Sequence, residues 1–392
     1  MHEQSEATAT LPETPVNPTP PAANDALATQ TVYTPTFSGS GKEYFRIWLV
    51  NLMLTVATLG IYSAWAKVRR LQYFDRNTQL AGASFDFHGD PKAILKGRLM
   101  ATVLLCAYHY AFGFSKVFGF TVIGVLLVAL PMFMRGALRF RLQNTAYRGL
   151  RFSFGGSTAD AYKTYLPLLL ALLMPAVLLA IDSSGKLAIA GFLLYLGWPL
   201  MHGAMRQYQH GHLQYGGQQS RYDVRPRSFY PIYFKCLGLA LAAFLIAAVV
   251  FGGTAAVLTV AGGWGKSSNT AAIIGTVIGV AFGYIAYLFA GPYVQARVGN
   301  LAWSHTRFPD LEIRSNMSAR SLIWLQTKNA VLTLLTLGLY RPFAVVKLHR
   351  FRLANITLHA PLGLEHIAAQ AAQPAGAAGD SIADFFGIDL SW

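Results

Sequence analysis

Long apolar runs separated by short basic segments follow one another along most of this chain. A helix crosses the hydrocarbon core of a bilayer with roughly 17 to 20 apolar residues. Six runs come close to that length or exceed it: 99–114, 117–134, 165–181, 187–201, 237–260 and 271–290. Because short connections join them in pairs, we predict an all-α polytopic membrane protein with six full transmembrane helices arranged as three hairpins.

Two shorter apolar segments, 51–70 and 329–350, lie outside the six runs and resemble each other. They share a Thr-Leu-Gly-x-Tyr sequence, so that Gly60 and Tyr62 in the first correspond to Gly338 and Tyr340 in the second. Glycine tolerates the positive φ of a tight turn, which makes this sequence a candidate hairpin turn. We expect each segment to be either a re-entrant hairpin or a single kinked spanning helix.

The placement of charge bears on this choice and on the topology of the chain. The formal net charge is +15, yet only three of the 32 Lys and Arg residues, Lys116, Lys186 and Lys266, lie in the tips between paired runs. The positive-inside rule then places the basic hairpin bases in the cytoplasm and the tips outside. Spanning segments at 51–70 and 329–350 would put basic flanks on both sides of the membrane, whereas re-entrant hairpins keep them, and both termini, in the cytoplasm.

Composition and charge together limit the class of protein and its partners. Hydrophobic residues make up 54% of the 392 residues and charged residues only 12%, whereas a soluble domain is about 25% charged. The basic excess follows membrane topology, which argues against nucleic acid and favours contact of the cytoplasmic loops with anionic lipid headgroups. We therefore expect a multi-pass membrane protein.

The composition also divides the chain into three parts. Residues 1–36 form a tail rich in Pro, Thr and Ala, residues 37–359 form the membrane domain, and residues 360–392 join an Ala-rich linker to an acidic, aromatic terminus. The first tail reads as disordered. The second is either disordered or docks on the protein's own cytoplasmic loops, on a partner protein or on a second copy of the chain.

Asparagine recurs after the basic ends of apolar segments, at Asn77, Asn144, Asn300 and Asn355. Asn and Gly are typical left-handed residues at helix C-termini, so capping is the simplest interpretation. A broader interpretation is a unit repeated five times, in which an aromatic segment, a helical hairpin and a basic exit follow one another. Alternating aromatic residues favour short strand-like connections at the cytoplasmic interface. The five units begin near Phe37, Phe87, Phe154, Tyr222 and Ile313.

Three features together resemble a known family. An aromatic-x-Gly sequence begins at Phe37, the Thr-Leu-Gly turn leads into Trp65-Ala-Lys-Val-Arg, and Asn77-Thr is followed by Gly-x-x-Phe-x-Phe. This combination resembles the YjgN family of bacterial inner-membrane proteins. The resemblance implies a multi-pass inner-membrane protein but brings no substrate or catalytic residue with it. The later copy departs from the pattern, since Arg341-Pro-Phe stands where the first copy has Ser63-Ala-Trp.

No motif for catalysis, cofactor binding or metal binding is recognisable in the sequence. All 17 acidic residues fall in tails, loops or a hairpin tip, so that no carboxylate lies inside a predicted span, where ion-coupled transporters place theirs. His109 is the one ionisable residue well inside a predicted span. It is either functional or a neutral histidine bonded to a neighbouring helix. We expect no catalytic residue, cofactor or metal ion, and no enzymatic activity.

Two functions fit these features. Broken helices around a cavity with basic rims are typical of a transporter or channel, here for an anionic or amphiphilic solute. The alternative is a non-catalytic membrane organiser that binds lipids or partner proteins through its basic cytoplasmic face. The candidate residues for either function are Gly60, Tyr62, Trp65, Gly338, Tyr340, Asn77, Asn144, Asn300, Asn355 and His109.

Overall fold

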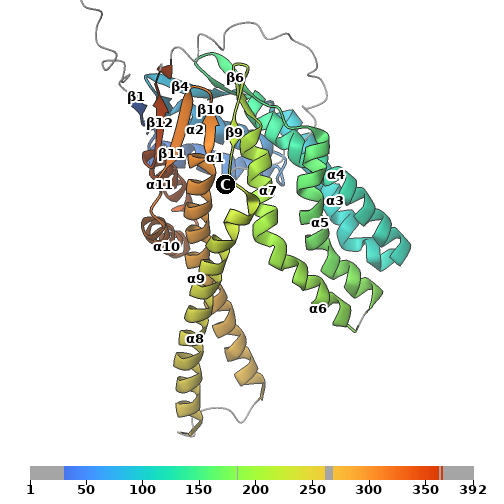
Figure 1. The fold of residues 1–392 in the computed structure, drawn as a ribbon. Helices are drawn as coiled ribbons and strands as arrows, with labels where there is room; N and C mark the ends of the chain where they lie inside the picture. The colour runs from blue at the N-terminus through green and yellow to red at the C-terminus, as the bar shows by residue number, and fades with distance from the viewer. Residues whose placement is uncertain (1–30, 183, 261–267, 362, 365–392) are drawn as a thin grey trace, which may run out of the picture.

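Helical hairpins extend away from a layer of short strands (Figure 1). The computed structural model describes residues 31–182, 184–260, 268–361 and 363–364, so the predicted tails lie largely outside it. The described helices, in chain order, are α1 (Gly41–Ala57), α2 (Ser63–Arg76), α3 (Pro91–Phe114), α4 (Lys116–Gln143), α5 (Thr158–Ile181), α6 (Lys186–Phe192), η1 (Leu193–Gly197), α7 (Trp198–Gly211), η2 (Pro226–Phe229), α8 (Tyr230–Val260), α9 (Ser268–Ser304), α10 (Ala319–Leu335) and α11 (Arg341–Ala354).

Short strands lie before and after each helical hairpin, so the fold is mostly helical, as predicted, but not all-α. They are β1 (Thr31–Tyr33), β2 (Thr36–Phe37), β3 (Thr78–Leu80), β4 (Ala83–Phe87), β5 (Thr145–Tyr147), β6 (Leu150–Phe154), β7 (Leu213–Tyr215), β8 (Gln218–Gln219), β9 (Arg221–Tyr222), β10 (Thr306–Phe308), β11 (Leu311–Ser315) and β12 (Ile356–Ala360). The alternating aromatic segments expected at the hairpin bases fall in β4 and β6.

The strands form two antiparallel sheets that share their ends. One sheet has the order β1-β12-β11-β10-β9, and the other runs from β2 to β8 in sequence order. Only Thr34 and Pro35 separate β1 from β2, and only Ser220 separates β8 from β9. Each sheet therefore ends where the other begins, and the described strands close into a ring.

Side chains from both sheets meet in one hydrophobic cluster. Its buried members are Leu80, Tyr147, Tyr215, Leu358, Ala360 and Leu364. Tyrosine hydroxyls join alternate strands, β3 to β5 and β5 to β7, since Tyr147 Oη donates to the Leu80 carbonyl at 2.8 Å and Tyr215 Oη donates to the Tyr147 carbonyl at 3.2 Å. The strand ring is thus filled by packed side chains.

Local sequence explains how each hairpin joins the ring. Ala81 and Gly82, with φ of 45° and 76°, form the two-residue turn between β3 and β4, and Arg148 and Gly149 repeat it between β5 and β6. Small polar residues then start the helices. The Ser40 hydroxyl accepts from the Glu43 amide, and the Glu43 carboxylate accepts from the Ser40 amide, in a complete capping box.

Three helical stretches in the described part of the chain are long and apolar enough to cross a membrane: Lys116–Gln143, Thr158–Ile181 and Lys186–Gly211. The prediction of six full transmembrane helices is therefore not supported. Run 99–114 lies in α3, where three consecutive polar aromatic residues, Tyr108 to Tyr110, lower its hydropathy. Runs 237–260 and 271–290 lie in α8 and α9, and many of their side chains lie outside the described residues.

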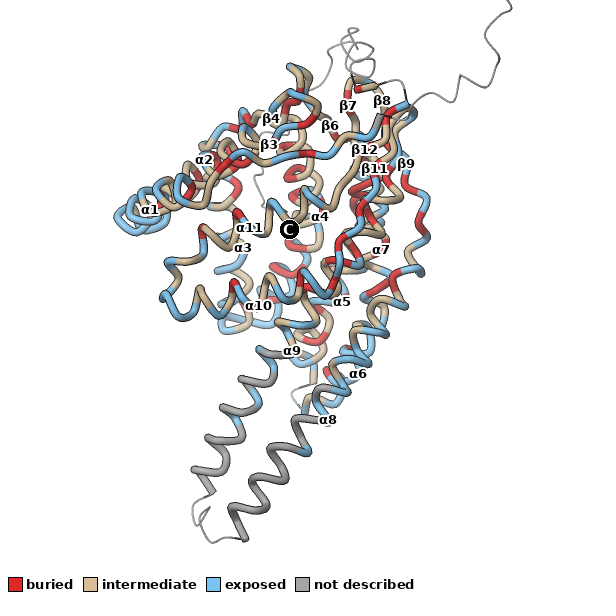
Figure 2. Tube along the Cα trace, turned by 90° about the vertical axis from the view of Figure 1, so that its left-hand side faces the viewer, coloured by how far each residue is buried: buried red, intermediate tan, exposed pale blue. Residues whose placement is uncertain are grey.

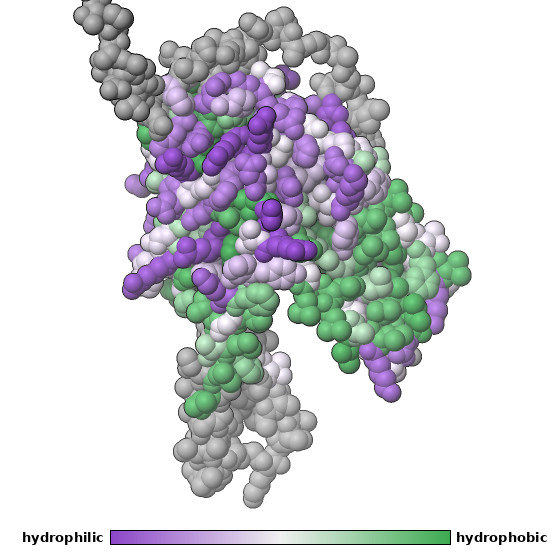
Figure 3. Space-filling view, in the orientation of Figure 1, coloured by the Kyte–Doolittle hydropathy of each residue, from purple (hydrophilic) through white to green (hydrophobic). Residues whose placement is uncertain are grey.

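Burial and hydropathy divide the molecule in the same way. Buried residues gather where the helices meet the strands, and most residues at the tips of the first and third hairpins, α1–α2 and α5–α6, are exposed (Figure 2). Hydrophilic residues cover the strand end, while hydrophobic residues cover most of the described surface of the helices below it (Figure 3). Exposed apolar helix surface on this scale is typical of a protein that contacts lipid.

The first and last hairpins lie side by side. Thr31 of β1 pairs with Ala360 of β12, and α1 contacts α11. A Cβ atom on Gly41 would lie 2.7 Å from the Phe343 ring, so this position in α1 leaves no room for a larger residue. The chain therefore brings its two Thr-Leu-Gly segments together.

Candidate functional site

The first Thr-Leu-Gly sequence ends one helix and starts the next. Leu59 and Gly60 have φ of 50° and 94°, which breaks the helix after α1. The Thr58 hydroxyl donates to the Leu54 carbonyl at 2.8 Å and accepts from the Tyr62 amide at 2.9 Å, so it joins the end of α1 to the start of α2. Only glycine adopts the second of these conformations without strain.

The second sequence has the same geometry between α10 and α11. Leu337 and Gly338 have φ of 48° and 94°. The Thr336 hydroxyl donates to the Leu332 carbonyl at 2.7 Å and accepts from the Tyr340 amide at 2.9 Å. In both segments the helices double back, so each forms a hairpin with a fully exposed leucine at its tip: Leu59 is 95% exposed and Leu337 is 94% exposed.

A pocket of about 210 Å³ lies between these two hairpins, and we call it the basic pocket. Its lining residues come from α1, α2, α3 and α11: Tyr44, Trp48, Asn51, Ser63, Ala66, Lys67, Arg70, Arg98, Arg341, Pro342 and Val345. Four of them are cations, and none is an aspartate or glutamate. The electrostatic potential inside it therefore favours an anion.

Two helices begin at the basic pocket. Ser63 is the first residue of α2, and Arg341 holds the same place in α11. The Arg98 guanidinium of α3 donates to the Ser63 hydroxyl, so that both helix N-termini have a guanidinium beside them. The positive end of each helix dipole adds to the attraction for an anion.

A buried amide also lines the basic pocket. Asn51 is only 7% exposed, and its Oδ1 has no hydrogen-bond partner in the described part of the chain. The corresponding Asn329 is equally buried, but its Nδ2 donates to the Ala344 carbonyl at 3.5 Å. The two hairpins therefore differ at this position.

A second, largely apolar cavity of about 510 Å³ adjoins the first, and we call it the apolar groove. It is lined by Tyr284, Gln326, Asn329, Ala330, Thr333, Leu334, Leu337, Gly338, Arg341, Ala344, Val345 and Leu348. Arg341 and Val345 line both cavities. A charged site and an apolar site thus meet at one arginine.

Three of the four predicted asparagines cap helices. The Nδ2 atoms of Asn77, Asn144 and Asn355 donate to the carbonyl four residues earlier, at 2.8, 2.8 and 2.7 Å. Their φ values are −91°, −93° and −105°, so they are not the left-handed caps that we expected. At Asn77 and Asn144 the backbone amide donates to the same carbonyl, so side chain and backbone together satisfy the helix end.

Asn300 has a different place. It lies inside α9, where its Oδ1 accepts from the Met317 amide at 2.8 Å and the Ser315 hydroxyl at 2.9 Å, and its Nδ2 donates to the Met317 carbonyl at 2.9 Å. His305 follows the end of α9, and its Nδ1 lies 2.9 Å from the carbonyl four residues earlier, as does that of His212 after α7. A search for asparagine alone misses these histidines.

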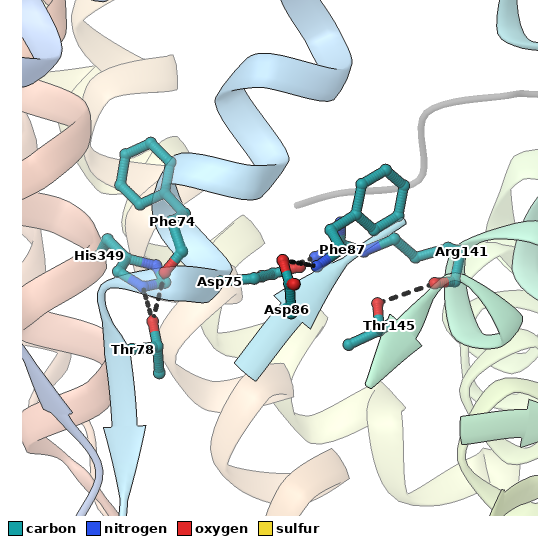
Figure 4. Close-up of polar contacts among 8 residues, drawn as sticks. All are labelled: Phe74, Asp75, Thr78, Asp86, Phe87, Arg141, Thr145 and His349. Carbon is teal, nitrogen blue, oxygen red and sulfur yellow. Dashed lines mark hydrogen bonds and ion pairs between the residues drawn. The ribbon is translucent and has the colours of Figure 1, made fainter. Parts of the chain in front are cut away.

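The last hairpin is bonded to the first at its strand end (Figure 4). Nε2 of His349 lies 3.1 Å from the Thr78 hydroxyl, and that hydroxyl donates to the Phe74 carbonyl at 2.7 Å. Since Thr78 has only one hydrogen to donate, Nε2 of His349 is the donor. Burial, with a smaller contribution from two nearby arginines, lowers the pKa of His349 to about 4.

An ion pair joins the first two hairpins (Figure 4). Oδ1 of Asp75 lies 3.3 Å from Nη2 of Arg141, and this guanidinium lies over the Phe87 ring at 5.1 Å. Asp75 Oδ2 and Arg141 Nη1 are buried without a hydrogen-bond partner among the described residues. Because the contact is made through one atom of each group, burial outweighs the guanidinium and raises the pKa of Asp75.

The remaining predicted residues do not converge on one site. His109 is exposed on α3. Tyr62 stacks on Trp65 with ring centroids 6.2 Å apart, and the Tyr340 hydroxyl accepts from Lys347 Nζ at 2.6 Å. The basic pocket was not predicted, because Arg98 and Arg341 are far apart in sequence. The one sequence feature that pointed to this pocket was Arg341, which stands in the second Thr-Leu-Gly segment where the first has Ser63.

Comparison with known proteins gives a family for the chain. The proteins named Inner membrane protein YjgN are similar to it: that of Salmonella typhimurium is 32% identical over 176 residues, 42% of this chain and 43% of the relative. Two from Escherichia coli are 32% identical over 149 residues, 36% of each chain. The matched segments thus span less than half of these relatives, and no solved structure matches. Residues 33–385 match the family described as "Bacterial protein of unknown function (DUF898)", and the chain therefore belongs to that family.

Proposed function

We propose that this protein is a transporter of the bacterial inner membrane that binds an anionic amphiphile between its first and last hairpins. The observation that carries the proposal is the junction of the two cavities at Arg341, where a basic pocket meets an apolar groove. An amphiphile has the matching division into a charged head and an apolar tail. The inner-membrane location is supported by the names of the YjgN relatives.

Charge supports the choice of an anion. Lys67, Arg70, Arg98 and Arg341 surround a pocket of about 210 Å³ to which the described part of the chain contributes no carboxylate. A partly enclosed site lined by charges of one sign concentrates ions of the opposite sign, because its low-dielectric walls focus the field. A cationic or neutral solute would gain nothing from these four groups.

Entry from the side of the molecule fits the packing better than passage along the axis of the strand ring. Tyr147, Tyr215 and Leu358 fill that ring together with other apolar side chains. A solute on the axis would have to displace this cluster, whereas the apolar groove lies between α9, α10 and α11. The same filled ring favours the alternative function, a membrane organiser that binds lipid without moving it.

The topology that we propose places the strand ring in the cytoplasm. Because Thr31 and Ala360 pair, both ends of the described chain lie together on the ring. The two Thr-Leu-Gly hairpins would then enter the membrane from the cytoplasmic side without crossing it. Reporter fusions at Trp392 test this directly: a cytoplasmic reporter should be active there, and an active periplasmic reporter would contradict the topology.

Binding tests the proposed recognition. Full-length protein in detergent should bind an anionic lipid such as dioleoyl phosphatidylglycerol in preference to dioleoyl phosphatidylcholine. The combined variant Arg98→Gln and Arg341→Gln should lose at least tenfold in affinity for the anionic lipid only. Lys163→Gln is the matched control, since its side chain is 78% exposed and pairs with Asp160 away from the basic pocket. Equal binding of both lipids would contradict the proposal.

Movement of the lipid separates the two functions. In proteoliposomes, a fluorescent anionic lipid should change leaflets faster with the wild-type protein than with the double variant. Normal binding without faster movement would favour the organiser. A loss of both activities in the Lys163→Gln control would show that the assay reports general damage.

A further inference from the structure

A buried, unsatisfied oxygen in the basic pocket specifies the ligand beyond its charge. Oδ1 of Asn51 lines this pocket, in a side chain that is 7% exposed, and has no hydrogen-bond partner among the described residues. Buried polar atoms in folded proteins nearly always have a partner. An amide oxygen accepts hydrogen bonds and donates none, so its missing partner is a donor.

The second hairpin shows what the same residue does without a ligand. Asn329 corresponds to Asn51 and is buried to the same extent, and its amide nitrogen bonds to the Ala344 carbonyl within the hairpin. Asn329 lines the apolar groove, and its oxygen is not among the fully buried side-chain atoms of the described residues that lack a partner. Of the two corresponding asparagines, only Asn51, on the side where the four cations gather, has a buried oxygen without a partner among the described residues.

The ligand must then present two kinds of group within a small volume. One is an anion, for Arg98, Arg341 and the two helix N-termini, and the other is a hydrogen-bond donor, for Asn51. The volume of about 210 Å³ is below the roughly 300 to 1,000 Å³ of pockets that enclose whole drug-sized ligands. A headgroup fits it, and the acyl chains of a lipid would have to lie elsewhere.

We propose that the basic pocket binds the headgroup of an anionic phospholipid that carries free hydroxyl groups. Its phosphate lies against Arg98 and Arg341, one hydroxyl donates to Oδ1 of Asn51, and an acyl chain follows the apolar groove past Arg341. This assignment rests on the proposed function and adds to it the chemical class of the lipid. Soluble glycerol phosphate offers the same polar groups, but it would leave the groove unused.

The experiment compares two anionic lipids that differ only in the hydroxyls. Dioleoyl phosphatidylglycerol and dioleoyl phosphatidylpropanol have the same charge, acyl chains and number of headgroup carbons, and only the first has free hydroxyl groups. Native mass spectrometry of the full-length protein in detergent should give an affinity about tenfold higher for phosphatidylglycerol, as expected for one hydrogen bond to a buried acceptor. This comparison uses the wild-type protein and needs no variant to fold.

Variants then locate the donor site. Asn51→Leu should remove the difference between the two lipids, whereas Asn329→Leu should leave it intact. Equal affinities of the wild-type protein for the two anionic lipids, both above phosphatidylcholine, would overturn this inference and leave the proposed function standing. Binding of phosphatidylcholine as tight as that of the anionic lipids would overturn both.

A competition arm distinguishes the lipid from a soluble solute. Glycerol phosphate should displace phosphatidylglycerol only at concentrations far above that of the lipid, because it makes no contact with the apolar groove. Displacement at equal concentrations would overturn the assignment to a lipid and point to the soluble phosphate.

Discussion

Nε2 of His349 lies 3.1 Å from the hydroxyl of Thr78, so a histidine of the last hairpin is bonded to β3, the strand that follows the first hairpin. The rings of Phe37 and Phe74 each lie 4.9 Å from the imidazole and exclude water from it. The junction between the two hairpins is therefore built around a neutral histidine. It lies at the strand end of α11, away from the Thr-Leu-Gly turn.

This histidine should make the protein sensitive to acid. Its pKa is about 4 in the fold and 6.5 in the unfolded chain. The unfolded state thus binds the proton more tightly, so the stabilisation is complete above pH 6.5 and is lost as the pH falls toward 4. The loss should reach up to about 3 kcal/mol. Thermal unfolding in detergent at pH 7.5 and 4.5 measures it.

The control for this prediction is His349→Asn, which keeps a donor for Thr78 and cannot be protonated. Its unfolding midpoint should fall less between the two pH values than that of the wild-type protein. His88→Asn, a change of an exposed histidine, should behave as the wild-type does. An equal acid sensitivity of all three proteins would contradict the role given to His349.

Removing Arg141 should destabilise the protein in a pH-dependent way. In Arg141→Met the Asp75 carboxylate is left buried without its cation, which should cost about 3 kcal/mol at neutral pH. The pKa of Asp75 is already raised by burial, so the folded state binds the proton more tightly than the unfolded state. The loss should therefore be smaller at pH 5 than at pH 7.5, as measured by chemical unfolding.

The double variant Asp75→Asn and Arg141→Met completes this test. It has no buried charge, so it should be more stable than Arg141→Met alone at pH 7.5. A double-mutant cycle with no coupling between the two positions would show that the 3.3 Å contact adds nothing to the fold.

Glycine should be required at the two hairpin turns for conformational reasons. Gly60 and Gly338 both have φ of 94°, and a Cβ atom at either place would meet nothing within 4 Å. Alanine there should cost about 1 to 2 kcal/mol through backbone strain alone. Gly113→Ala is the matched control, because Gly113 has equally open surroundings inside α3 without a positive φ. That change should be neutral or stabilising in thermal unfolding.

Asn300 should matter more to stability than the asparagines at helix ends. Its amide makes three hydrogen bonds to the residues around the end of β11, whereas the Asn144 amide bonds to one carbonyl. Asn300→Ala should cost about 2 to 3 kcal/mol and Asn144→Ala about 1 kcal/mol. The reverse order in urea unfolding would show that the cap is the more important contact.

The hairpin turns were predictable because their cause is local. A glycine in the sequence Thr-Leu-Gly-x-Tyr implies a positive φ, and the structure has it at Gly60 and Gly338. The strand ring was only partly predictable. Alternation at Phe85 and Phe87 indicates a strand-like segment, but strands of two to five residues carry too few positions to specify their partners.

The functional site could not be predicted for a different reason. Arg98, Arg341 and Asn51 meet only because the ring closes and brings the last hairpin against the first. The Arg-x-x-Asn spacing also misled at Asn300, since α9 continues to Ser304 and a histidine takes the capping place. A spacing rule looks for one residue type, whereas any side chain that places a nitrogen beside the last carbonyl groups of a helix can cap it.

Closure of the strand ring also sets an order for folding during synthesis. β1 bonds to β12, which is the last of the described strands to leave the ribosome. The hairpins made earlier can pack one by one, but the ring keeps a gap between β1 and β11 until residues 356–360 emerge. A chain cut short before that point has two unpaired strand edges, and such edges recruit other chains. Premature termination near the C-terminus should thus produce aggregates rather than a slightly shortened protein.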